Sequence, residues 1–140
     1  MELTYTLEEL PEVAKQLLSI GQDYAVWAFN APMGAGKTTL IAELCHSMGI
    51  EEAISSPTYS IINEYHTPSG KTICHMDWFR LKDEDEAIRT GVEDALYQHS
   101  LSLVEWPDIA SNLLPDDTLF ITIKIIDNQT RVLKTTIGSQ

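Results

Sequence analysis

The spacing of apolar residues along the chain predicts helices and strands in alternation. After a capping box formed by Thr6 and Glu9, apolar residues recur at helical spacing until Gly21, which predicts a helix that begins between residues 7 and 10. The apolar run over residues 24–29 is typical of a strand buried on both faces, and helical spacing returns over residues 37–48. The first third of the chain is therefore predicted to form a helix, a strand, a loop of small residues and a second helix.

The rest of the chain predicts two β-hairpins separated by helices and one buried strand. The hairpins comprise residues 60–65 with 71–76, and 118–126 with 131–137. Between them we expect a helix that opens at residues 82–86, KDEDE, a second helix over 92–98, a strand over 101–104 and a short helix capped by Asp108. This order predicts one α/β domain over residues 1–140, with a mixed, partly parallel central sheet and helices on both of its faces.

The charge balance argues against a protein that grips nucleic acid by itself. Nine Lys and Arg residues stand against 21 Asp and Glu residues in 140, which gives a formal net charge of −12. Duplex binding needs several phosphate-neutralising cations on one face, so any basic site must be local. The apolar runs are too short to span a bilayer and the first residues do not resemble a signal peptide, so we expect a cytoplasmic protein without a membrane partner.

The cysteines and histidines carry no metal-ligand spacing. Cys45 and Cys74 lie far apart in the sequence, each in an apolar context, and are predicted to be reduced thiols in the core. His75 lies within an apolar run and is predicted to be a core histidine rather than a ligand.

A phosphate-binding loop is the strongest chemical signal. The run from Gly34 to Thr39, GAGKTT, stands where a buried strand turns into a helix. In that position backbone N–H groups point at an anion, Lys37 supplies a cation to the β- and γ-phosphates, and the Thr38 hydroxyl coordinates Mg²⁺. The first glycine of the full G-x-x-x-x-G-K-[ST] signature is replaced by Ala31, and a left-handed backbone there would cost an alanine about 1 kcal/mol.

Two acids follow apolar runs where the carboxyl ends of neighbouring strands should meet the phosphates. Asp77 ends one run and Glu105 ends another. Such acids hold Mg²⁺ or orient the attacking water in phosphate-loop enzymes, although each alone could be a solvated strand-end acid. The chain lacks the N/T-K-x-D box of guanine recognition, which disfavours a regulatory GTPase. Its three arginines are few for a small-molecule kinase.

Five sequence blocks in a shared order resemble the TsaE (YjeE) family. They are GAGKTT at residues 34–39, SPTY at 56–59, EY at 64–65, HMDWFRL at 75–81 and VEW at 104–106. The resemblance implies a three-layer fold of the P-loop NTPase kind. It also implies a small Mg²⁺-dependent ATPase that works with TsaB and TsaD in threonylcarbamoyladenosine modification at position 37 of tRNAs reading codons that begin with A. Contact with tRNA is then indirect, through that complex.

The resemblance also assigns roles to individual residues. It implies that Thr38 and Glu105 approach Mg²⁺, that Asp77 supports hydrolysis, and that residues 56–59 form a switch over the γ-phosphate through Thr58. Lys37, Asp77 and Glu105 are thus the expected catalytic residues. The expected nucleotide-binding residues are Met33, Gly34, Ala35, Gly36, Lys37, Thr38, Thr39, Thr58 and Arg131.

Some alternatives stay open at this point. The sequence departs from the family at residues 31–33, which lack both the usual first glycine and an acid, and at Phe79, which replaces a tyrosine. Trp106 is equally a core anchor or a sensor near the nucleotide, and Arg131 is either a nucleotide contact or a surface charge. A nucleotide-gated binding module with incidental hydrolysis, and a small-molecule kinase, remain the alternative functions.

Overall fold

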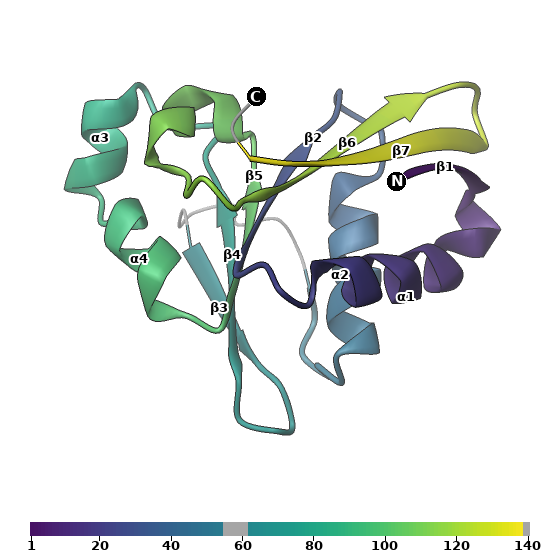
Figure 1. Ribbon diagram of the computed structural model, residues 1–140, viewed down its shortest axis with the longest axis horizontal. Helices are drawn as coiled ribbons and strands as arrows, with labels where there is room; N and C mark the ends of the chain where they lie inside the picture. The colour runs from purple at the N-terminus through teal and green to yellow at the C-terminus, as the bar shows by residue number, and fades with distance from the viewer. Residues whose placement is uncertain (55–61, 139–140) are drawn as a thin grey trace.

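A seven-stranded sheet forms the middle layer of the protein in the computed structural model, which describes residues 1–54 and 62–138 (Figure 1). The strands are β1 (Glu2–Thr6), β2 (Val26–Asn30), β3 (Ile62–His66), β4 (Thr72–Asp77), β5 (Leu101–Glu105), β6 (Leu119–Ile125) and β7 (Thr130–Ile137). Their order across the sheet is β1-β7-β6-β2-β5-β4-β3. The inner strands β6, β2, β5 and β4 run parallel, while β1, β7 and β3 pair antiparallel. This confirms the predicted mixed, partly parallel sheet.

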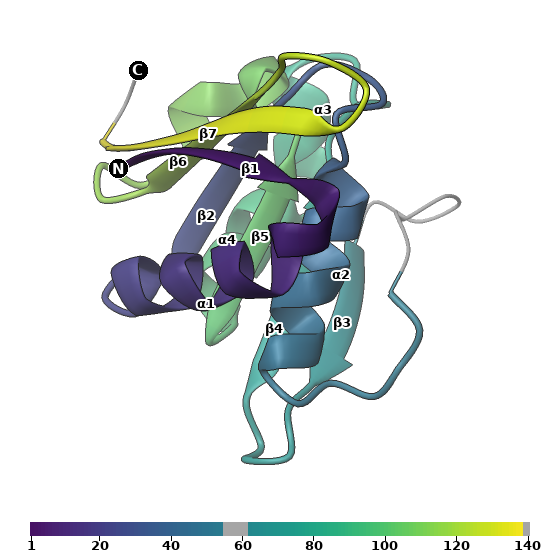
Figure 2. The same ribbon diagram turned by 90° about the vertical axis from the view of Figure 1, so that its right-hand side faces the viewer.

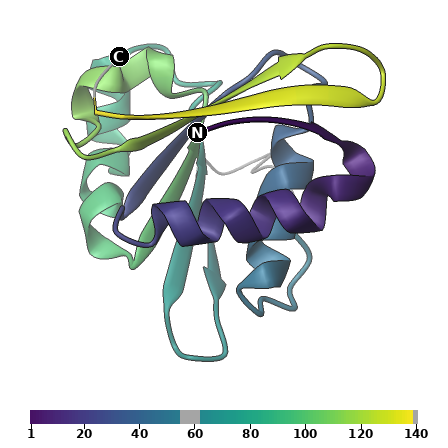
Figure 3. The ribbon, with the colours of Figure 1, turned by 45° about the vertical axis from the view of Figure 1, so that its right-hand side comes forward.

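Helices cover both faces of the sheet, as predicted. One face carries α1 (Leu10–Gly21) and α2 (Lys37–Ser47), which lie in front of the sheet in Figure 2. The other face carries α3 (Glu84–Arg89), α4 (Val92–Gln98) and the 3₁₀ helix η2 (Pro107–Leu113), the teal and green helices at the left of Figure 3. The result is a three-layer α/β arrangement. None of the described helices is long and apolar enough to cross a bilayer.

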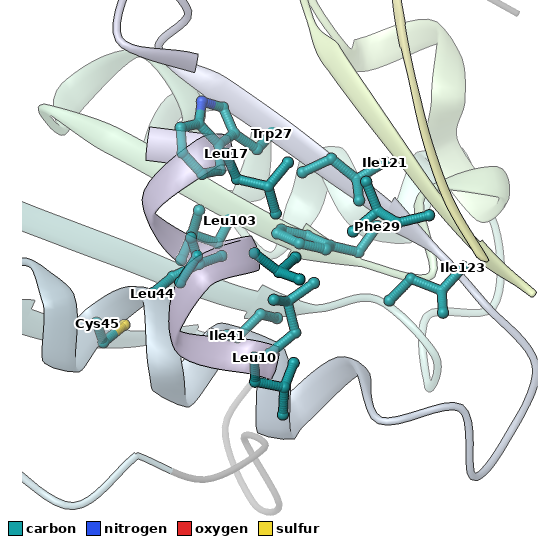
Figure 4. Close-up of a cluster of buried hydrophobic side chains, with 14 of the residues drawn as sticks. Leu10, Leu17, Trp27, Phe29, Ile41, Leu44, Cys45, Leu103, Ile121 and Ile123 are labelled. Atoms are coloured by element: carbon teal, nitrogen blue, oxygen red, sulfur yellow. The ribbon is translucent and has the colours of Figure 1, made fainter. Parts of the chain in front are cut away.

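The central strand β2 is buried on both faces because its side chains alternate between two cores. Trp27 and Phe29 pack beneath α1 and α2 together with residues such as Leu17 and Leu44 (Figure 4). Val26 points the other way, into the cluster formed with α3, α4 and η2. Burial of each such large apolar side chain stabilises the fold by about 1.5–3 kcal/mol. The continuous apolar run in the sequence thus reflects a strand with no solvent-facing side.

The predicted capping box starts the first helical segment. The backbone N–H of Thr6 donates to Glu9 Oε1 at 2.9 Å, and the Thr6 hydroxyl lies 3.2 Å from the same oxygen. Residues Leu7–Glu9 form a single 3₁₀ turn, η1, and the regular helix begins at Leu10 with Pro11 in its first turn. The start of α1 therefore falls where the sequence placed it, because proline is tolerated only in the first turn.

Three details differ from the sequence predictions. Strand β1 was not predicted, because only Leu3 and Tyr5 mark its inward face. Strand β2 begins at Val26 rather than at residue 24, since the chain is still turning there and the Tyr24 N–H donates to the Gly21 carbonyl. Asp108 does not cap the helix that follows β5: the cap is Trp106, and Pro107 occupies the first position of η2.

The two cysteines confirm their prediction. Cys45 and Cys74 are free and fully buried, one in each core. Burial raises the pKa of each thiol to about 12, with a smaller contribution from a nearby glutamate, Glu52 for Cys45 and Glu64 for Cys74. Such thiols are unreactive at neutral pH.

The end of α1 meets β2 at a close contact between Gly21 and Trp27. A Cβ atom on Gly21 would lie 2.2 Å from Cζ2 of the Trp27 ring, which is only 1% exposed. The ring is fixed further by its Nε1–H, which lies 3.0 Å from the Tyr24 carbonyl oxygen and 3.3 Å from that of Gly21. Only glycine fits at this position without a shift of the helix or the ring.

We therefore expect Gly21→Ala to lower the free energy of unfolding by roughly 1–3 kcal/mol, the usual cost of overpacking a core. Ser19→Ala, at an exposed position of the same helix, serves as the matched control and should leave stability nearly unchanged. Urea unfolding of both variants measures the difference. Equal stabilities would show that Trp27 moves aside freely.

Candidate functional site

The loop between β2 and α2 is shaped by two glycines. Gly34 has φ +79° and Gly36 has φ +93°, and Gly36 is the residue from which α2 starts. Both angles lie in the left-handed region that favours glycine, which explains why small residues occupy this turn. The loop thereby presents the first turn of α2, whose backbone N–H groups have no acceptor within the helix, at the carboxyl edge of the parallel strands.

Ala31 causes no strain in this loop. Among the described residues, Trp106 is the only non-glycine residue with a positive φ. Ala31 therefore does not adopt the left-handed conformation whose cost the sequence raised, and it packs partly against the core below α2. The missing first glycine is compatible with the loop geometry seen here.

A cavity of about 470 Å³ opens above the loop. It is lined by residues 32–39, which include all of the loop positions predicted to bind nucleotide, and by Asp77, Phe79, Glu105 and Trp106. The structure thus brings together the loop and the two strand-end acids. Thr58 and the rest of residues 56–59 lie outside the described residues.

Strand register explains why the two acids meet. Asp77 of β4 and Glu105 of β5 pair directly across parallel strands. Both share the strand face of Leu103, which packs under α1 and α2, so both acids lie on the side of the P-loop helix. Glu105 is only 2% exposed, which is incompatible with a solvated strand-end acid. Burial raises the pKa of Asp77, although the N–H of Phe79 donates to its Oδ1 at 2.9 Å and favours the carboxylate.

Lys37 projects its ammonium group toward the two acids of the cavity. The side chain is 7% exposed, and its Nζ has no hydrogen-bond partner among the residues that the structure describes. Burial lowers the pKa of Lys37, while the charges of Glu105 and Asp77 act in the opposite direction. A buried cation of this kind lacks the hydrogen bonds that an anionic ligand would provide.

Trp106 lies at the cavity rather than in the core. The Lys37 Nζ sits 3.4 Å from the centroid of its ring, a cation–π contact, and the ring of Phe79 lies 5.0 Å away, centroid to centroid. The backbone of Trp106 is left-handed, with φ +56°, and joins β5 to η2. Of the two alternatives that the sequence left open, the core anchor is wrong; the role of sensor stays a prediction.

Arg131 supports the loop from below. It is 7% exposed, and its Nε donates to the Ala35 carbonyl oxygen at 3.1 Å. A second nitrogen, Nη1, donates to the carbonyl oxygens of Asp127 and Thr130 at 2.6 and 3.1 Å. The surface-charge alternative for Arg131 is therefore wrong. Arg131 is not among the described residues that line the cavity, and its contact with a nucleotide stays a prediction.

His75 is buried as predicted, and its side chain contacts Glu105 of the candidate site. Its Nε2 lies 2.6 Å from Glu105 Oε2, and both side chains are almost fully buried. The sequence analysis missed this link. The signal was the spacing: His75 stands two residues before Asp77 and therefore on the same face of β4.

The donor set of the cavity suits a nucleotide with Mg²⁺. Mg²⁺ is commonly held by one or two side-chain oxygens together with phosphate oxygens and waters. Thr38, at the second position of α2, and Glu105 both line the cavity and provide a hydroxyl and a carboxylate for that purpose. Loop N–H groups and Lys37 face the same space and suit the phosphates.

Comparison with known proteins gives one consistent relationship. The sequence profile of a family described as threonylcarbamoyl adenosine biosynthesis protein TsaE matches residues 4–133. Proteins named tRNA threonylcarbamoyladenosine biosynthesis protein TsaE are similar to this chain. That of Haemophilus influenzae is 33% identical over 82% of this chain and 73% of its own length. That of Bacillus subtilis is 30% identical over 98% of this chain and 85% of its own length.

A solved structure shares the fold. The crystal structure of Bacillus subtilis YdiB superposes with a TM-score of 0.66 at 26% sequence identity, covering 99% of this chain and 87% of that one. The profile match spans nearly the whole chain and includes the loop, both acids and Trp106. The chain therefore belongs to the TsaE family.

Proposed function

We propose that this protein binds ATP with Mg²⁺ and hydrolyses it slowly as a component of tRNA threonylcarbamoyladenosine biosynthesis, acting with TsaB and TsaD. The observation that carries the nucleotide assignment is the buried ammonium of Lys37, which lies in a loop cavity with two carboxylates and has no hydrogen-bond partner among the described residues. The pathway assignment rests on the family and on the names of the relatives.

Each residue has a defined part in this proposal. The loop N–H groups and Lys37 hold the β- and γ-phosphates. Thr38 and Glu105 hold Mg²⁺, which when bound supplies positive charge to the phosphates. Asp77 pairs with Glu105 and lines the cavity, where a carboxylate can orient the attacking water and accept its proton. Arg131 keeps the loop in shape through Ala35.

The proposal predicts a protein that is a slow ATPase alone. Phosphoryl transfer is accelerated by an additional cation that stabilises the developing charge. Lys37 is the only lysine or arginine among the described residues that line the cavity. A partner protein can provide or organise such a cation, and the acidic charge of the chain makes direct binding of tRNA unfavourable.

Replacement of Lys37 tests nucleotide binding. Lys37→Ala should weaken the binding of ATP roughly 10- to 100-fold, because it removes charge-assisted hydrogen bonds to the phosphates. Titration calorimetry measures the affinity. Lys124→Ala, which removes the same charge from an exposed position on β6, should leave the affinity unchanged. Unchanged affinity in the Lys37 variant would refute the phosphate-loop assignment.

The two carboxylates should give separable defects. Glu105→Gln should reduce the tightening of ATP binding that Mg²⁺ causes, because it removes the charge of a proposed metal ligand. Asp77→Asn keeps an acceptor for the Phe79 N–H and should preserve affinity while lowering turnover by roughly 100-fold or more. Calorimetry with and without Mg²⁺ and a steady-state phosphate-release assay distinguish the two effects. The reverse pattern would exchange the roles of the two acids.

The partner proposal is tested by reciprocal coupling. Addition of TsaB and TsaD should change the hydrolysis rate severalfold, and ATP should in turn change the affinity of this protein for that complex, since binding couplings are reciprocal. Affinity is measured with ATP, with ADP and without nucleotide. Phosphate transfer to an acceptor other than water would favour a kinase. Nucleotide-dependent affinity without any effect of Asp77→Asn would favour a binding module in which hydrolysis is incidental.

A further inference from the structure

A buried hydrogen bond joins β4 to the proposed metal ligand Glu105. His75 Nε2 lies 2.6 Å from Glu105 Oε2, with His75 fully buried and Glu105 2% exposed. In the strand register, His75 stands opposite Leu103, and Glu105 stands opposite Asp77. The contact is therefore diagonal and places the imidazole one step deeper in the sheet than the two acids.

The surroundings of the His75 imidazole determine which ring nitrogen carries the hydrogen. A carboxylate only accepts hydrogen bonds, so the Nε2–H of His75 donates to Glu105 Oε2. Its Nδ1 is buried and has no partner among the described residues. A second N–H at Nδ1 would be a buried donor without an acceptor, which is costly. The hydrogen-bond network therefore assigns the hydrogen to Nε2, from which the ring donates to Glu105.

Packing alone does not account for a histidine at this position. The neighbouring inward residue on the same face of β4 is Ile73, which lies fully in the core beneath α2. An apolar side chain at position 75 would leave no buried nitrogen unsatisfied. A histidine here therefore costs free energy, and Glu105 provides its one side-chain hydrogen bond among the described residues.

The hydrogen bond leaves one carboxylate oxygen for the cavity. Glu105 lines the cavity together with Thr38, while its Oε2 is held by His75 from the side of the core. A glutamate has several rotatable bonds, and an unsupported carboxylate would lose conformational entropy on binding a metal ion.

We propose that His75 is a positioning residue that orients Glu105 toward Mg²⁺ in the nucleotide complex, an inference that rests on the proposed function. His75 is not among the described residues that line the cavity, so its role would be exerted through Glu105. Removal of residues that hold a metal ligand in place typically costs 10- to 100-fold in metal affinity.

Two amide substitutions that differ only in reach provide the test. The side-chain nitrogen of His75→Gln can approach the position of Nε2 and donate to Glu105, whereas that of His75→Asn is too short. Binding of a non-hydrolysable ATP analogue is measured by calorimetry with and without Mg²⁺, and the affinity of the analogue complex for Mn²⁺ is measured by electron paramagnetic resonance. Neither readout depends on turnover.

In His75→Asn, the tightening by Mg²⁺ and the affinity for Mn²⁺ should fall roughly 10-fold or more, whereas Mg²⁺-free binding stays unchanged. His75→Gln should restore most of the loss. His99→Gln is the matched control, because His99 Nε2 lies 2.7 Å from Glu64 Oε2 at the surface and its loss should change neither quantity. Should His75→Asn fail to fold, His75→Met takes its place as the variant without a donor.

The outcomes separate this inference from the function on which it rests. Wild-type Mg²⁺ dependence in the variant without a donor would overturn the positioning role of His75 and leave the proposed function intact. Absence of any Mg²⁺-dependent tightening in the wild-type protein would contradict the proposed function itself. Equal losses in His75→Gln and His75→Asn would reduce His75 to a packing role and would also overturn the inference.

Discussion

The parallel pairing of β5 with β2 on one side and with β4 on the other determines where the site can form. Phe29 pairs with Glu105, and Glu105 pairs with Asp77, so three strands end at the same level beneath the phosphate loop. A shift of a single residue in β5 would turn Glu105 to the face of α3 and α4 and break its contact with His75. The large side chains of the two cores prevent such a shift, because it would turn each buried side chain of β5 toward the opposite core. The packing of the sheet therefore fixes the relative positions of the side chains at the site.

The cavity contains charged groups whose capacity for hydrogen bonds is only partly filled by the described residues. Lys37 has an aromatic face and two nearby carboxylates, but no hydrogen bond from its Nζ among the described residues. One carboxylate oxygen of Glu105, Oε2, accepts a hydrogen bond from His75. Burial of groups in this condition costs free energy, which apolar burial elsewhere in the two cores offsets. The phosphates of a nucleotide and its metal ion carry the opposite charges and can complete both sets of contacts.

Much of this arrangement could be predicted from the sequence, and the remainder depends on contacts across the sheet. The loop was predictable because GAGKTT stands between a buried strand and a helix, and the acids were predictable because each ends an apolar run. Strand β1 was not, since Leu3 and Tyr5 alone are a weak alternation. Trp106 adopts a left-handed backbone that a bulky residue rarely takes, and the supports from His75 and Arg131 come from residues 30 and 96 positions away from their partners. The spacing of His75 and Asp77 places both on one face of β4, but no local pattern indicates the contact with Glu105, the contact of Arg131 with Ala35 or the backbone of Trp106.

The bond from Arg131 to the carbonyl of Ala35 has a consequence for the synthesis of the protein. The loop is made early, but the strands that flank β2, namely β5 and β6, and the strand that carries Arg131 are made much later. Strand β2, which leads into the loop, likewise finds both of its neighbours, β5 and β6, among the later strands. The loop therefore receives its support from Arg131 only after the last hairpin has been synthesised.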